Sequence, residues 1–138
     1  MKNDAEKRDP KAGVGRILIV DDSSFMRGSL KAIVEGGGYE VVGMAGDGEE
    51  ALAKYKGLKP DLVTLDVLME PVDGMAALES IREADPDAKV VMVTAMGQEE
   101  MQERARRLGA QGYIRKPFNP QEVMGVIGNV LDAEDKLT

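Results

Sequence analysis

Short apolar runs alternate with amphipathic stretches along the chain from Arg16 onward. Five runs rich in β-branched residues are expected to be strands: Ile17–Val20, Glu40–Ala45, Leu62–Leu65, Val90–Val93 and Gly112–Ile114. Each is short and nearly all apolar, which is typical of strands buried on both faces of a parallel sheet. The pattern therefore predicts five βα units and an α/β fold.

The stretches between these runs place apolar residues on one face at helical spacing. These faces are formed by Met26, Leu30, Ile33 and Val34; Leu52 and Tyr55; Leu78 and Ile81; Met101, Ala105 and Leu108; and Val123, Met124, Ile127 and Leu131. Gly36–Gly38 is expected to end the first helix, and Asn119 before Pro120 to begin the last. Five helices are therefore expected.

The two ends of the chain lack this pattern. Residues 1–15 are polar and contain Pro10, Gly13 and Gly15, so we expect a flexible N-terminal extension. Residues 132–138 are expected to be a short C-terminal tail. A chain of 138 residues leaves room for one domain, over residues 16–131. Any output would then pass through a partner.

Composition excludes several kinds of chemistry. The chain has no cysteine and no histidine, so thiolate nucleophiles, zinc clusters and imidazole bases are excluded, and a metal would have to be held by oxygen. The net charge of −7 argues against nucleic acid as a partner. No apolar run approaches the ~20 residues of a membrane span. A cytoplasmic protein is expected.

Polar residues stand at the carboxyl ends of the predicted strands, where open parallel sheets gather their functional groups. Asp21 and Asp22 follow the first strand, and Asp66 follows the third. Thr94 follows the fourth strand, and Lys116 follows the fifth. If the strand order is 2-1-3-4-5, the first and third strands are neighbours and their three carboxylates converge on one edge.

Converging carboxylates repel one another, which raises their pKa values unless a cation neutralises them. Oxygen ligands suit octahedral Mg²⁺. Asp66 could then act as a nucleophile that forms an aspartyl phosphate, while Mg²⁺ and Lys116 stabilise charge on the transferring group and Thr94 donates to it.

Each of these residues taken alone has a simpler interpretation. Asp21 and Asp22 could be turn formers that cap a helix at Ser23 or Ser24. Lys116 could be an exposed surface charge. Their joint occurrence at successive strand ends favours a site.

Five segments resemble the receiver domain of response regulators, in the order and at the spacing of that family. They are LIVDDSSFMR (residues 18–27), TLDVLM (64–69), VDG (72–74), VTAMG (93–97) and YIRKPF (113–118). The resemblance covers residues 16–131. It implies a flavodoxin-like, doubly wound five-stranded parallel sheet in the order 2-1-3-4-5.

The resemblance also implies a role for each matched residue. It makes Asp66 the phosphoacceptor, Asp21 and Asp22 the metal-binding pair, the Leu68 carbonyl a further metal ligand, Lys116 the phosphoryl-pairing lysine, and Thr94 and Tyr113 the switch residues. A cis peptide between Lys116 and Pro117 is implied as well. Tyr113 could instead be an ordinary strand residue.

The chain departs from the family at two places. The family usually has proline directly after the residue matching Met69, whereas here Glu70 precedes Pro71, which leaves the shape of this loop open. Leu68 and Met96 stand where polar side chains of some relatives help to place the hydrolytic water. We therefore expect slow autodephosphorylation.

The resemblance implies a stand-alone two-component regulator that takes a phosphoryl group from a histidine kinase and is not a multiple-turnover enzyme. SSFMR and VTAMGQ look most like chemotaxis regulators that act on the flagellar motor. An output protein, a phosphatase as a further partner, and a monomeric state are also expected. In the family, the fourth helix, fifth strand and fifth helix commonly form the partner surface.

Several alternative functions fit some of these residues. A phosphorelay intermediate or a regulator outside chemotaxis would fit the same site. A hydrolase of the haloacid-dehalogenase type would need an acid at Leu68, and a flavin binder would need a phosphate-cradling loop where Asp21 and Asp22 stand. A receiver that only binds partners is disfavoured because every matched position is filled.

Overall fold

The computed structural model describes residues 15–137, with side chains as far as Asp132. The expected extension over residues 1–14 lies outside this range. Gly15 already belongs to the fold, because it is buried and its carbonyl accepts a hydrogen bond from the Glu40 N–H at 2.9 Å.

A parallel sheet of five strands forms the centre of the molecule, in the order β2-β1-β3-β4-β5. The strands are β1 (Arg16–Val20), β2 (Glu40–Ala45), β3 (Leu62–Leu65), β4 (Val90–Thr94) and β5 (Gly112–Arg115). This order confirms the predicted fold class. β1 and β3 are paired with Val20 opposite Leu65, so the residues that follow these two strands begin side by side.

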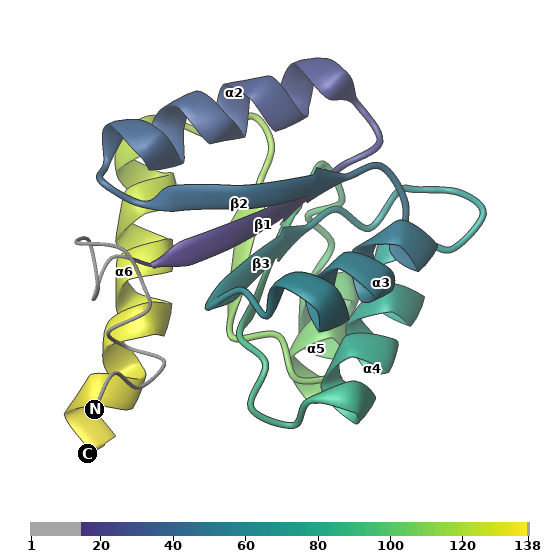
Figure 1. Cartoon of the computed structure of the whole chain (residues 1–138). Helices are drawn as coiled ribbons and strands as arrows, with labels where there is room; N and C mark the ends of the chain where they lie inside the picture. Colours follow the sequence, from purple (N-terminus) through teal and green to yellow (C-terminus); the bar gives the residue numbers. More distant parts are fainter. Residues whose placement is uncertain (1–14, 138) are drawn as a thin grey trace.

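Within residues 15–137, five helices cover the two faces of this sheet (Figure 1). They are α2 (Ser24–Gly36), α3 (Gly48–Leu58), α4 (Gly74–Ala84), α5 (Glu99–Arg107) and α6 (Pro120–Leu137). Helices α2 and α6 lie on one face, and α3, α4 and α5 lie on the other (Figure 1). The backbone of residues 132–137 continues α6, where the sequence predicted a short tail.

Each face has its own apolar cluster. Leu30 and Ile127 belong to the cluster beneath α2 and α6, and Tyr55 and Leu78 belong to the cluster beneath α3, α4 and α5. The expectation that all strands are buried on both faces is wrong for β2 and β5, which are only partly buried. These are the edge strands, and each has a neighbour on one side only.

Side chains cap the helices where they begin at the carboxyl edge of the sheet. The Ser23 hydroxyl accepts the Met26 N–H at 3.2 Å, which starts α2. Asn119 accepts the Glu122 N–H at 2.8 Å, which confirms the predicted start of α6. Such caps satisfy N–H groups that have no partner within the helix. They also fix the loops that carry the polar residues.

Candidate functional site

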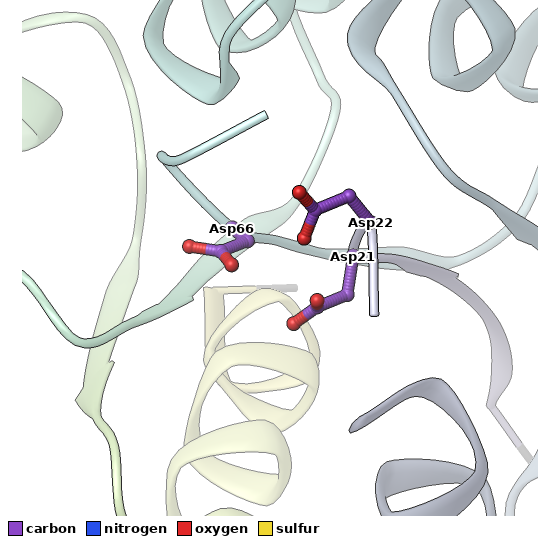
Figure 2. A group of neighbouring side chains, drawn as sticks. All are labelled: Asp21, Asp22 and Asp66. Atoms are coloured by element: carbon purple, nitrogen blue, oxygen red, sulfur yellow. The ribbon is translucent and has the colours of Figure 1, made fainter. Parts of the chain in front are cut away.

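Three carboxylates meet at the carboxyl edge of the sheet, as the strand order required. One oxygen from each of Asp21, Asp22 and Asp66 lies within 4.8 Å of the other two (Figure 2). Asp21 and Asp66 are 1% and 5% exposed, whereas Asp22 is exposed to solvent. The pairing of β1 with β3 causes this convergence, because it places residues 21 and 66 directly after adjacent strand ends.

Lys116 joins this cluster from the end of β5. Its Nζ atom lies 2.7 Å from Asp21 Oδ2 and 3.0 Å from Asp66 Oδ2. Burial alone would lower the pKa of Lys116, but the hydrogen bonds to the two carboxylates outweigh burial and raise the pKa above its ordinary value. Lys116 is therefore a charged partner of the site, and the interpretation as an exposed surface charge is wrong.

The simpler interpretation of the acidic pair as helix caps is also wrong. The cap of α2 is Ser23, whose own N–H donates to Asp21 Oδ1 at 2.9 Å. Asp21 uses its other carboxylate oxygen for Lys116. Asp21 therefore forms a turn with Ser23, but neither acidic side chain caps α2.

The loop after β3 also contacts the Asp66 carboxylate. The Leu68 N–H donates to Asp66 Oδ1 at 3.2 Å, while the Leu68 side chain is 54% exposed. Gly74 is needed here, because a Cβ atom at this position would lie 1.9 Å from the Asp66 carbonyl oxygen. Glu70 and Pro71 are exposed and joined by a cis peptide bond. The Lys116–Pro117 peptide is also cis, as the resemblance implied.

Thr94 and Tyr113 are linked through the main chain of Met96. The buried Thr94 hydroxyl accepts the Met96 N–H at 3.3 Å, and the Tyr113 hydroxyl donates to the Met96 carbonyl. Burial raises the pKa of Tyr113, and the negative charge of Asp66 raises it further. The two predicted switch residues thus share one peptide segment beside the carboxylates.

The donor set fits a hard divalent cation. Three of the four candidate ligands are carboxylates, and two of these are buried, so their mutual repulsion favours a bound positive charge. Oxygen donors of this kind are the ligands that Mg²⁺ and Mn²⁺ prefer.

Arg27 is a residue at this site to which the sequence assigned no role. Its Nη1 atom donates a 2.6 Å hydrogen bond to the Asp21 carbonyl oxygen. Arg27 lies within one of the quoted motifs, but its partner is a main-chain atom. Side-chain types and spacing therefore carry no signal for this contact.

Comparisons with known proteins agree with the fold and the site. The sequence profile of the response regulator receiver domain matches residues 17–128, and the chain belongs to this family. The chemotaxis protein CheY of Thermotoga maritima is 47% identical over 115 residues, which cover 83% of this chain and 96% of that protein. CheY of Bacillus subtilis is 44% identical over 117 residues, which cover 85% and 98%.

A solved structure gives the same result in three dimensions. The chain superimposes on one chain of the CheX–CheY–BeF3–Mg²⁺ complex from Borrelia burgdorferi with a TM-score of 0.84 at 34% identity. The match covers 93% of this chain and 98% of the matched chain. The chain is thus a CheY-like receiver. No helix among residues 15–137 is long and apolar enough to cross a membrane.

Proposed function

We propose that this chain is a stand-alone two-component response regulator that accepts a phosphoryl group on Asp66. The observation that carries this proposal is the meeting of Asp66 with Asp21, Asp22 and Lys116 at one edge of the sheet. A buried carboxylate beside a lysine and two further acids is suited to nucleophilic attack on phosphorus and to holding the resulting charge.

The chemistry assigns a task to each residue. An oxygen of Asp66 forms a bond to phosphorus while the bond from phosphorus to the donor nitrogen breaks, and the nitrogen keeps the electron pair. Asp21, Asp22, Asp66 and the Leu68 carbonyl would hold Mg²⁺, which when bound neutralises charge on the transferring group. Lys116 pairs with a phosphoryl oxygen, and the Thr94 hydroxyl donates to another.

Thr94 and Tyr113 would couple phosphorylation of the site to the surface of the protein. When the Thr94 hydroxyl turns to donate to the phosphoryl group, the Met96 N–H that donates to it is expected to move with it, and the Met96 carbonyl in turn accepts from Tyr113. Tyr113 also lines a groove of about 560 Å³ between α5, β5 and α6. Phosphorylation would therefore favour one arrangement of the surface on which an output protein binds.

The pathway is proposed from similarity. The CheY relatives support a role in chemotaxis. We further propose a histidine kinase as donor, the flagellar motor switch as output and a phosphatase as an additional partner. We propose a cytoplasmic monomer with one receiver domain that includes Gly15 and the whole of α6, and that does not act as a multiple-turnover enzyme. A phosphorelay intermediate or a regulator outside chemotaxis would use the same site.

Incubation with acetyl phosphate tests this function. We expect the intact mass to increase by one phosphoryl group when Mg²⁺ is present, and to stay unchanged in EDTA. A phosphorylated histidine kinase should act as donor under the same conditions. No adduct in a folded protein with Mg²⁺ would contradict the proposal, and repeated turnover of a phosphate ester would point to a hydrolase.

A further inference from the structure

The main chain of Asp21 is held on both sides. The carbonyl oxygen of the Asp21–Asp22 peptide accepts the 2.6 Å hydrogen bond from Arg27 Nη1. The N–H of the preceding Val20–Asp21 peptide donates to the Ala45 carbonyl of β2 at 3.0 Å. Since the Asp21–Asp22 peptide joins the two acidic residues, the Arg27 bond limits the rotation that would turn one carboxylate away from the other.

An acidic side chain on α3 lies near the Arg27 guanidinium. A Cβ atom at Gly46 would lie 3.6 Å from Arg27 Nη1 and 3.9 Å from Glu50 Oε1, so both groups lie beside this glycine. Glu50 accepts the Gly46 N–H at 2.8 Å and pairs with Lys54 at 3.2 Å. These contacts fix a carboxylate next to the guanidinium.

The backbone bond from Gly46 lowers the pKa of Glu50, and the charges of Lys54 and Arg27 lower it further. Glu50 is therefore ionised at neutral pH. Its negative charge offsets part of the positive charge of Arg27 close to the acidic cluster.

Two effects of Arg27 on a bound divalent cation have opposite signs. Its positive charge repels the cation, so charge alone predicts that removing Arg27 tightens cation binding. Its hydrogen bond holds the acidic pair in place, so positioning predicts that removing Arg27 weakens cation binding. The direction in which cation affinity changes when Arg27 is removed therefore separates the two effects.

We infer that Arg27 is a positioning residue for the acidic pair, and that Glu50 compensates part of its positive charge. This inference rests on the proposed cation site at Asp21, Asp22 and Asp66. The planar fork of arginine fixes the direction of the bond to the Asp21 carbonyl, whereas a lysine ammonium provides the charge without the fork.

Mn²⁺ binding, followed by electron paramagnetic resonance of the free ion, tests this inference without using phosphorylation. We expect Arg27→Ala to weaken Mn²⁺ binding about tenfold, the lower end of the usual effect of losing an outer-shell partner. Arg27→Lys should fall between Arg27→Ala and the wild type, and Glu50→Gln should weaken binding by a smaller factor. Circular dichroism checks that each variant folds.

Arg107→Ala is the matched control, because it removes one arginine from an exposed position on α5. It should leave Mn²⁺ binding as in the wild type. Unchanged or tighter binding in folded Arg27→Ala would overturn the inference while leaving the proposed function intact. If Arg27→Ala does not fold, wild-type affinity in Arg27→Lys overturns it. A wild type that binds no Mn²⁺ would overturn the cation site, and this inference with it.

Discussion

The ammonium of Lys116 donates a 3.0 Å hydrogen bond to Oδ2 of Asp66, and the two residues stand 50 positions apart in the sequence. The same ammonium bonds Asp21 at 2.7 Å. One cation thus compensates two buried carboxylates. It also stands beside the oxygen that would receive the phosphoryl group, so stability and chemistry depend on the same contact.

Replacing Lys116 with methionine should destabilise the protein when no divalent cation is present. Asp21 and Asp66 would then be buried without this positive partner, and we expect the free energy of unfolding at neutral pH to fall by about 3 kcal/mol. Mg²⁺ should restore part of the loss. Urea unfolding in EDTA and in Mg²⁺ measures both effects.

Arg107→Met is the control for Lys116→Met, because Arg107 forms an exposed ion pair with Glu103 at 3.7 Å. Its loss should cost less than about 1 kcal/mol. Equal effects of the two substitutions would mean that Lys116 does not compensate the buried carboxylates.

Replacing Thr64 with valine should stabilise the protein. The Thr64 side chain is fully buried in β3, and its hydroxyl has no hydrogen-bond partner among the described residues. Valine keeps the shape without the unsatisfied polar atom, so we expect a gain of about 1 kcal/mol. Thr94→Val should lower stability instead, because it removes the acceptor of the Met96 N–H. A loss in Thr64→Val would mean that the hydroxyl has a partner.

The tyrosine hydroxyls should lose their protons at higher pH in the folded protein than in the unfolded chain. Burial raises the pKa of all three, and a hydrogen bond to Asp85 adds to this for Tyr55. Because the protonated form is favoured by folding, this stability is fully present below the ordinary pKa of about 10 and is lost as pH rises above it. The raised pKa of Lys116 acts in the same direction.

Near-ultraviolet absorbance follows this titration, since the chain has no tryptophan. We expect tyrosinate to form at higher pH in buffer than in urea. The Tyr55→Phe variant should lose much of this difference. Coincident titration curves for the folded and unfolded wild type would contradict the burial argument.

The phosphorylated protein should be long-lived. The exposed Leu68 side chain and the Met96 side chain offer no polar group to orient a hydrolytic water. We expect decay over minutes or longer, and faster decay in Leu68→Asn, which gains an amide while keeping the main-chain carbonyl. Phe25→Ser is the control, because it makes another exposed apolar residue polar and should leave the decay unchanged. Loss of the phosphoryl group within seconds in the wild type would contradict this expectation.

Much of the fold was predictable because β-branched runs and helical periodicity are local signals. The five strands follow from them, and the end of α2 at Gly36 and the start of α6 follow from the equally local signals of Gly36–Gly38 and of Asn119 with Pro120. The partial burial of β2 and β5 was not predictable from their composition, because burial depends on which strands lie at the edges. The continuation of α6 past residue 131 likewise had no apolar periodicity to indicate it.

The composition of the site was predictable, but its internal contacts were not. The residues at strand ends identified Asp21, Asp66 and Lys116. The bonds that Met96 makes through its main chain, and the contact of Arg27 with the Asp21 carbonyl, involve backbone atoms, which are the same in every residue. Only the folded arrangement reveals them.

Chemical mapping of the phosphoryl group tests the central claim most directly. The protein is treated with acetyl phosphate and Mg²⁺, reduced with borohydride, which converts an aspartyl phosphate to homoserine, and digested for mass spectrometry. We predict homoserine at residue 66 in the wild type and none at any position in Asp66→Asn. Homoserine at residue 21 or 22, or an undiminished phosphoryl adduct in folded Asp66→Asn, would contradict the assignment of Asp66 as the phosphoacceptor.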